Sequence, residues 1–155
     1  MLKWLGLSAV VIALDLYTKY RVQAALIYGE HVTVTSFFDL VLFLNPGAAF
    51  SFLSSENGWQ GVFFGLCAVI ASVFIVWMLL KHPDKKLFCF ALSLILGGAI
   101  GNLWDRITLG HVVDFLYFHY NEHDWPAFNV ADSAIFCGVV LLIWDEFKKP
   151  ATGVS

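Results

Sequence analysis

Two aspartates, Asp114 in "VVDF" and Asp132 in "FNVADS", are the residues of this sequence best suited to catalysis. Asp132 stands just before an apolar run that ends at Trp144. A charge inside a membrane helix costs at least ~2.5–3.5 kcal/mol, so such a residue usually marks a functional site. Two carboxylates in close approach share one proton, because like charges push their pKa values apart. Such a pair activates water and hydrogen-bonds a peptide carbonyl, and it titrates as a unit, so neither member is assigned a fixed role.

The composition is that of a membrane protein. Of the 155 residues, 59% are hydrophobic and 14% are charged, and the mean hydropathy is +0.76. Soluble domains carry roughly 25% charged residues. The length predicts a single domain over residues 1–155, and we expect no nucleic-acid partner. The odd number of cysteines, without a CxxC pair, predicts small buried side chains rather than disulfides or a zinc site. These cysteines are Cys67, Cys89 and Cys137.

Four segments are candidates to cross the membrane, which takes ~20 mostly apolar residues. Residues 59–80 and 87–104 qualify plainly. The other two, at about 4–20 and 129–147, reach spanning length only by including an aspartate. The two marginal helices are therefore the two that carry carboxylates, as a site built into helix ends would require. The first of them resembles a signal peptide but has no small-residue cleavage site, so we interpret it as an uncleaved anchor.

The positions of lysine and arginine predict the orientation. With four spans, both termini share a side with the short loop "KHPDKK", residues 81–86, and six of the nine basic residues lie on that side. We therefore expect both termini in the cytoplasm and the loops 21–58 and 105–128 outside.

This topology brings polar residues from four separate segments to one level, the outer face of the membrane. Chance would scatter them over both sides. We expect the basic and amide side chains among them to orient the aspartate pair and the backbone of a substrate. These residues are Lys19, Asn45, Asn102, Arg106 and Asn129.

Some of these residues also have a purely structural interpretation. Asn129 and Asp132 are typical of a helix N-cap, which the helix dipole favours. Asp15 and Lys19 are spaced i, i+4 and can satisfy each other as an ion pair. Neither arrangement would require convergence at one level.

Two further features have simple interpretations. The same topology places Asp105 and Arg106 at the outer end of the third span, although "DR" is also typical of an ordinary interfacial turn. The segment "HYNEHD" (119–124) offers two histidines and two acids for a metal, but its pattern favours an irregular loop, so we expect no metal and no cofactor.

The outer loops have strand-like patterns. Residues 31–45 alternate β-branched or apolar with other residues, and residues 112–120 do so more weakly. Both are rich in Phe and Tyr, which suits backbone lying at a membrane interface. We expect a small β element on the outer leaflet beside four helices.

Five blocks of this sequence occur in the order typical of one family. They are "DLYTK" (15–19), "NPGAAFS" (45–51), "GGAIGNLWDR" (97–106), "GHVVDF" (110–115) and "FNVADS" (128–133). Together they resemble the lipoprotein signal peptidases (signal peptidase II), bacterial membrane aspartyl proteases, over nearly the whole chain. Two departures are small: Pro46 stands within the second block, and Leu16 replaces a residue that is often polar.

The resemblance implies a fold: four helices, a periplasmic β-cradle and an interfacial helix within 47–57. It implies a multi-pass protein of the bacterial plasma (inner) membrane. It also implies that Asp114 and Asp132 are the catalytic pair, which agrees with the residues themselves. The supporting residues that it implies are Asp15, Lys19, Asn45, Gly47, Asn102, Arg106 and Asn129.

The implied reaction removes the signal peptide of a prolipoprotein that carries diacylglycerol, just before the lipidated cysteine. No metal or cofactor takes part, globomycin-type cyclic peptides inhibit, membrane lipid surrounds the enzyme, and we expect a monomer. Two other function classes stay open from the residues: a small cation-coupled transporter and a non-catalytic membrane scaffold. Transporters commonly place acids near the midplane and show repeats, whereas here the acids collect at one face and no repeat occurs.

Overall fold

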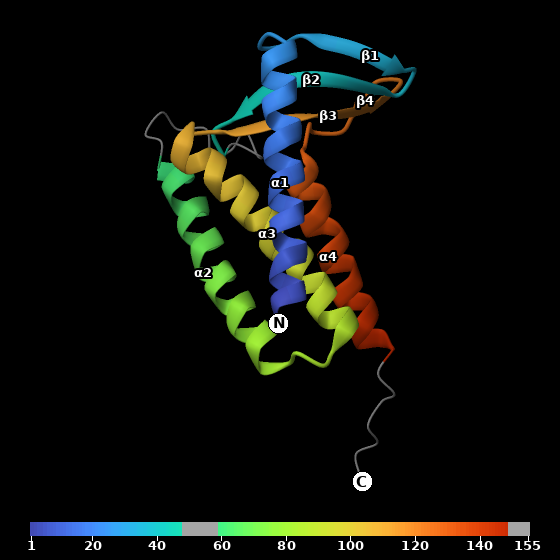
Figure 1. Cartoon of the computed structure of the whole chain (residues 1–155). Coiled ribbons are helices and arrows are strands. Elements are labelled where there is room, and N and C mark those ends of the chain that lie inside the picture. The colour runs from blue at the N-terminus through green and yellow to red at the C-terminus, as the bar shows by residue number, and fades with distance from the viewer. Residues whose placement is uncertain (48–58, 149–155) are drawn as a thin grey trace.

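The computed structural model describes residues 1–47 and 59–148, and Figure 1 shows these as a helical bundle beneath a small sheet. The described helices are α1 (Leu2–Ala25), α2 (Trp59–Lys81), α3 (Lys86–Thr108) and α4 (Val130–Phe147). The strands are β1 (His31–Thr35), β2 (Phe38–Asn45), β3 (Val112–Tyr120) and β4 (His123–Asp124). The helix α1 begins and α4 ends at the end of the bundle away from the sheet.

The helix α3 is the centre of the bundle, because it packs against α1, α2 and α4. Glycines allow this close packing. A Cβ added at Gly98 would collide with the carbonyl oxygen of Ala131 at the start of α4, and one at Gly97 would lie 2.6 Å from the Cβ of Val11 in α1. These two glycines therefore allow α3 to approach α1 and α4 closely.

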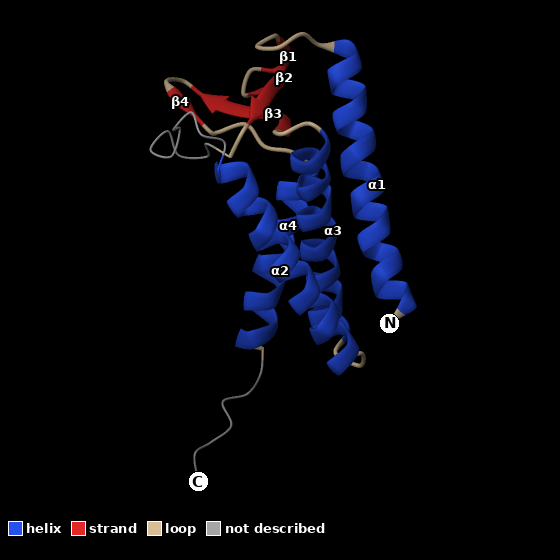
Figure 2. Ribbon diagram, turned by 90° about the vertical axis from the view of Figure 1, so that its left-hand side faces the viewer, coloured by secondary structure: helices blue, strands red, loops and turns tan. Residues whose placement is uncertain are grey.

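The helices α2 and α3 are long and apolar enough to cross a membrane, whereas α1 and α4 do not meet that criterion. This division follows the sequence prediction, in which the first and last segments were marginal because each contains an aspartate. Figure 2 shows α1 at one side of the bundle, reaching the level of the sheet.

The four strands form one antiparallel sheet in the order β1-β2-β3-β4. The strand pattern of 31–45 is a hairpin of β1 and β2, and β3 coincides with the predicted 112–120. The prediction of an irregular loop at 119–124 was wrong. There β3 ends, a turn at Asn121 adopts a φ of 53°, and β4 pairs back through His119 with Asp124. Apart from Gly47, the predicted interfacial helix at 47–57 lies outside the described residues.

An apolar cluster packs the helices together at the end of the bundle opposite the sheet. It joins α1, α2 and α3 through Trp4, Ile75, Leu79, Cys89, Leu92 and Leu96. Cys89 is buried as predicted, but Cys67 and Cys137 are exposed, so that prediction was wrong for two of the three. These two cysteines lie on helix faces that no other described element covers, where a membrane protein meets lipid, so their apolar surroundings in the sequence did not imply burial within the protein.

Candidate active site

Asp114 lies in β3 and is almost completely buried, with 3% of its surface exposed. Two amides bind its carboxylate: the Nδ2 of Asn45 donates to Oδ2 at 3.0 Å and the Nδ2 of Asn129 donates to Oδ1 at 2.7 Å. Burial raises the pKa of Asp114 to about 7, and the charge of Asp132 acts in the same direction while the bond from Asn45 opposes it. Asp114 therefore carries its proton in about half of the molecules at pH 7 and in most of them below that pH.

Asp132 lies in the first turn of α4. The backbone N–H of Asp132 donates to the Oδ1 of Asn129 at 2.9 Å, and the N–H of Asn129 donates back to the Oδ2 of Asp132 at 3.3 Å. This is the capping box that the structural interpretation predicted. The Nδ2 of Asn102 also donates to the Oδ1 of Asp132 at 2.7 Å, so the carboxylate does more than cap its helix.

Two asparagines join the aspartates to each other. The Nδ2 of Asn129 donates to Asp114 and also lies 3.1 Å from the Oδ1 of Asn102, whose own amide donates to Asp132. Asn129 is fully buried and Asn102 is 6% exposed. A carboxylate from the sheet and one from a helix start are thus held in one hydrogen-bonded network. The charge of Asp132 acts on Asp114, so the two carboxylates are electrostatically coupled.

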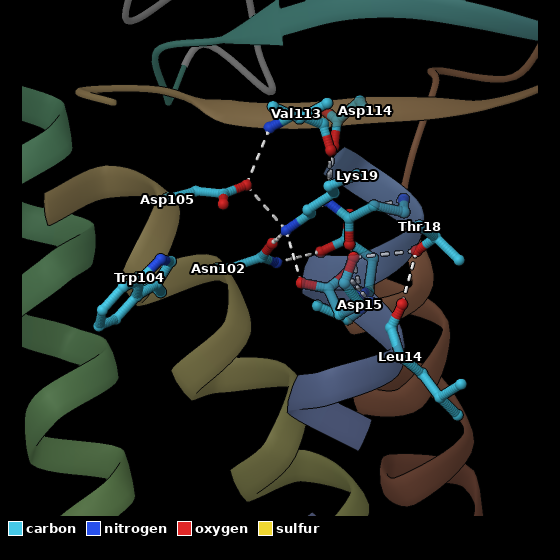
Figure 3. A network of polar contacts seen from close by, with 12 residues as sticks. Leu14, Asp15, Thr18, Lys19, Asn102, Trp104, Asp105, Val113 and Asp114 are labelled. Carbon is cyan, nitrogen blue, oxygen red and sulfur yellow. Dashed lines mark hydrogen bonds and ion pairs between the residues drawn. The ribbon is translucent and has the colours of Figure 1, made fainter. Parts of the chain in front are cut away.

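Lys19 supports this network from α1 (Figure 3). Its Nζ lies 2.7 Å from the Oδ2 of Asp15 and 2.9 Å from the Oδ2 of Asp105, and it donates to the Oδ1 of Asn102 at 2.9 Å. The predicted i, i+4 pair of Asp15 and Lys19 is confirmed. Asp105 and Arg106 lie within α3 near its end at the sheet, as the predicted topology placed them. The alternative of an ordinary interfacial turn is wrong, since both residues are helical and Asp105 is buried.

Asp105 is the site residue that the predicted set lacked. The spacing gave a signal, because Asn102 and Asp105 stand i, i+3 and so share one face of α3. The ion pair with Lys19 depends on the packing of α1 against α3, which spacing along one helix does not reveal.

Arg106 and Gly47 lie at the edge of the network. The Nη1 of Arg106 donates to the carbonyl oxygen of Asn102 at 3.1 Å, and its guanidinium lies 5.7 Å from the ring centre of Phe64. Within the part of the chain that the structure describes, its Nε is buried without a hydrogen-bond partner. Gly47 has a φ of 104°, and its N–H donates to the Oδ1 of Asn45, which fixes the amide that binds Asp114.

Two pockets open beside the aspartates. One, of about 330 Å³, is lined by Asp132 and by apolar side chains of α4 and of the preceding segment. The other, of about 270 Å³, is lined by Asp114, Asn45 and Phe43. The segment 125–128 separates them, because Trp125 and Phe128 line the first while Pro126 and Ala127 line the second.

Two carboxylates in one network can perform the acid–base chemistry of an aspartic protease. The comparison with known families tests this interpretation. The model of the family described as signal peptidase (SPase) II matches residues 7–148. The chain belongs to the signal peptidase II family. The resemblance inferred from the five sequence blocks is therefore confirmed.

Relatives and solved structures agree with this family. The chain is 55% identical to the lipoprotein signal peptidase of Janthinobacterium sp. (strain Marseille), covering 96% of this chain and 90% of that protein. It is 56% identical to that of Ralstonia nicotianae, covering 94% and 84%. Two structures of a bacterial membrane enzyme superpose with a TM-score of 0.84 each. Their identities are 29% and 30%, and they cover 100% and 97% of this chain and 96% of each solved chain.

Signal peptidase II is an aspartic protease that cleaves the signal peptides of lipoprotein precursors. The chain is accordingly a membrane enzyme of this activity. The transporter and scaffold hypotheses are thereby set aside. The roles of individual residues, including the aspartate pair, stay predictions.

Proposed function

We propose that Asp114 and Asp132 are the catalytic pair, and that the substrate is a prolipoprotein already carrying diacylglycerol, cut just before its lipidated cysteine. The observation that carries the proposal is the network in which Asn129 donates to Asp114 and to Asn102, and Asn102 donates to Asp132. No other carboxylates of the described chain are joined in this way beside two pockets. Neither metal nor cofactor takes part.

The chemistry follows from one shared proton. The ionised carboxylate takes a proton from water, and the hydroxyl oxygen forms a bond to the scissile carbonyl carbon while the protonated carboxyl hydrogen-bonds the carbonyl oxygen. As the tetrahedral intermediate collapses, the C–N bond breaks and the leaving amine takes the proton. The raised pKa of Asp114, about 7, favours it as the protonated member before attack, with Asp132, the more accessible of the two, as the base.

The remaining site residues position this pair. Asn45, held by Gly47, and Asn129 aim the carboxyl group of Asp114. The buried Nε of Arg106 is a donor for a substrate carbonyl, since it lacks a partner among the described residues. A substrate lying across residues 125–128 would pass from one pocket to the other and present an extended backbone to both aspartates.

For the membrane arrangement, we propose one polytopic domain over residues 1–155 with four spans in the bacterial inner membrane and both termini in the cytoplasm. Two features support this. The helix α1 begins and α4 ends at the same end of the bundle as the basic loop 81–86. The sheet and both aspartates lie at the other end. In this arrangement, water and the precursor would reach the site from that outer face. The proposal includes a monomer in contact with membrane lipid, inhibited by globomycin-type peptides.

The test is cleavage of a diacylated prolipoprotein by the full-length protein in detergent, followed as a gel shift. Asp114→Asn and Asp132→Asn should each lower kcat at least ~1,000-fold, because neither amide can take a proton from water or share one. Thermal unfolding establishes that each variant is folded. Asp84→Asn, on the exposed loop between α2 and α3, is the matched control and should cleave normally. Cleavage surviving in a folded variant of either aspartate would overturn the assignment of the pair.

A further inference from the structure

Two backbone contacts single out Asp105 and Asp15. The Oδ2 of Asp105 accepts a hydrogen bond at 3.1 Å from the N–H of Val113, the residue directly before Asp114. The Oδ1 of Asp15 accepts one at 2.8 Å from the N–H of Ala131, the residue directly before Asp132. Each carboxylate therefore holds the backbone next to one of the two aspartates.

The same lysine joins these two carboxylates. Lys19 carries three ammonium N–H donors, and three oxygens lie within 2.9 Å of its Nζ, from Asp15, Asp105 and Asn102. Asp15 is 0% exposed, Lys19 1% and Asp105 3%. Water therefore does not screen these three charges. We call these three residues the Lys19 bracket.

We propose that Asp105 is a positioning residue of this protease, and that the Lys19 bracket sets the separation of the two catalytic aspartates. This inference rests on the proposed catalytic pair. Asp105 connects β3 to α1 through Val113 and Lys19, and Asp15 connects α4 to the same lysine through Ala131. A displacement on either side would move one aspartate relative to the other.

The bracket also sets the charge beside the pair. Its net charge is −1, from one lysine and two aspartates. Among the described residues, Arg106 also lies near the pair, and the charges of Asp105, Asp114 and Asp132 act on it. Lys19 acts to lower the pKa of Asp114. Removing the negative charge of Asp105 leaves Lys19 less compensated, so the pKa of Asp114 should fall by about 0.5–1 unit.

The experiment compares Asp105→Asn with Asp105→Ala by measuring kcat and KM from pH 5 to 9 in detergent. The asparagine keeps an acceptor for the N–H of Val113 but loses the charge. The fall of its activity at high pH, the alkaline limb of the pH profile, should move about 0.5–1 pH unit lower. Its kcat at pH 5.5 should stay within ~5-fold of wild type. The alanine loses the acceptor as well, so kcat should fall ~100-fold at every pH with KM unchanged, because a misplacement near 1 Å costs that much.

A double variant separates the effect of the bracket's net charge from the effect of its positioning contacts. Lys19→Met with Asp105→Asn restores the net charge of −1, and its alkaline limb should return towards that of wild type, although kcat falls. Asp39→Asn is the matched control, because Asp39 is also buried, at 7% exposed, but pairs with His31 and His119 in the sheet. It should leave the alkaline limb unmoved.

Three results would overturn the inference: an unmoved limb in folded Asp105→Asn, wild-type kcat in Asp105→Ala, or a double variant whose limb stays with the single variant. If Asp105→Ala does not fold, the asparagine and the double variant still decide through their pH profiles. Failure here is distinct from failure of the catalytic pair, which Asp114→Asn and Asp132→Asn test without altering the bracket.

Discussion

The helices α2 and α3 have the same length, 23 residues, and both can cross a membrane, yet they do different work. In the most apolar stretch of α3 half of the residues are buried within the protein, whereas in α2 the share is 11%. The helix α3 brings Asn102, Asp105 and Arg106 to the site, and α2 brings no carboxylate. The more apolar helix faces outward, and the less apolar one organises the enzyme.

Hydropathy alone would rank α2 above α3, although α3 carries the site residues. Lipid is as apolar as a leucine side chain, so an outward face needs no packing partner and tolerates change. A buried helix contacts neighbours on every side, and its polar residues persist only where partners satisfy them. The same substitution should therefore have a much larger effect on stability and activity in α3 than in α2.

The largest effect is expected from Gly98→Ala in α3. The added Cβ would collide with the carbonyl oxygen of Ala131, so α3 and α4 must separate and Asp132 moves with α4. We expect loss of folded protein or of nearly all activity. The matched change in α2, Gly61→Ala, meets nothing within 4 Å and should stabilise the protein by about 0.5–1 kcal/mol. Thermal unfolding and cleavage by both variants would check this, and a tolerated Gly98→Ala would refute the close packing.

A smaller contrast is expected between two leucines. Leu96 in α3 is 2% exposed and belongs to the apolar cluster, whereas Leu66 in α2 is 58% exposed. Leu96→Ala should lower the free energy of unfolding by about 2–5 kcal/mol, because it leaves a cavity. Leu66→Ala should lower it by less than about 1 kcal/mol. Denaturation in a single detergent measures both, and equal losses would contradict the difference between the helices.

Much of the fold and site could be predicted from the sequence. Four helices, two strand regions and the convergence of Asp15, Lys19, Asn102 and Asp132 follow from apolar length and from where each apolar run carries a polar residue. The role of Asn129 is harder to predict, because its pattern fits a helix cap. It is a cap and also binds Asp114, and only the position of β3 beside the start of α4 shows the second role.

What the sequence could not provide depends on contacts between elements. The role of Asp105 requires that α1 lie beside α3, and the exposure of Cys67 and Cys137 requires knowing which helix faces have no neighbour. The hairpin at 119–124 was missed because its strand β4 is only two residues long, too short for an alternating pattern.

The smallest effect concerns pH, and it tests the α3 part of the comparison. The proton in question is that of Asp114, which Asn129 connects to Asn102 of α3. Burial raises the pKa of Asp114 from 3.8 to about 7, so the folded protein holds this proton more tightly than the unfolded chain does. This group's contribution to folding stability should therefore be lost as pH rises from about 4 to about 7, and stay level above.

Activity should follow the same proton. We expect kcat/KM to fall about tenfold per pH unit above about 7, because Asp114 then no longer donates to the substrate carbonyl. Leu96→Ala should leave that alkaline limb in place, since its cavity lies far from any charge of the site, while its melting temperature falls by a similar amount at pH 6 and pH 8. Activity that rises through pH 7 would contradict the need for a protonated Asp114. A limb that moves in Leu96→Ala would show that packing and protonation are coupled, and the separation of structural from catalytic roles along α3 would fail.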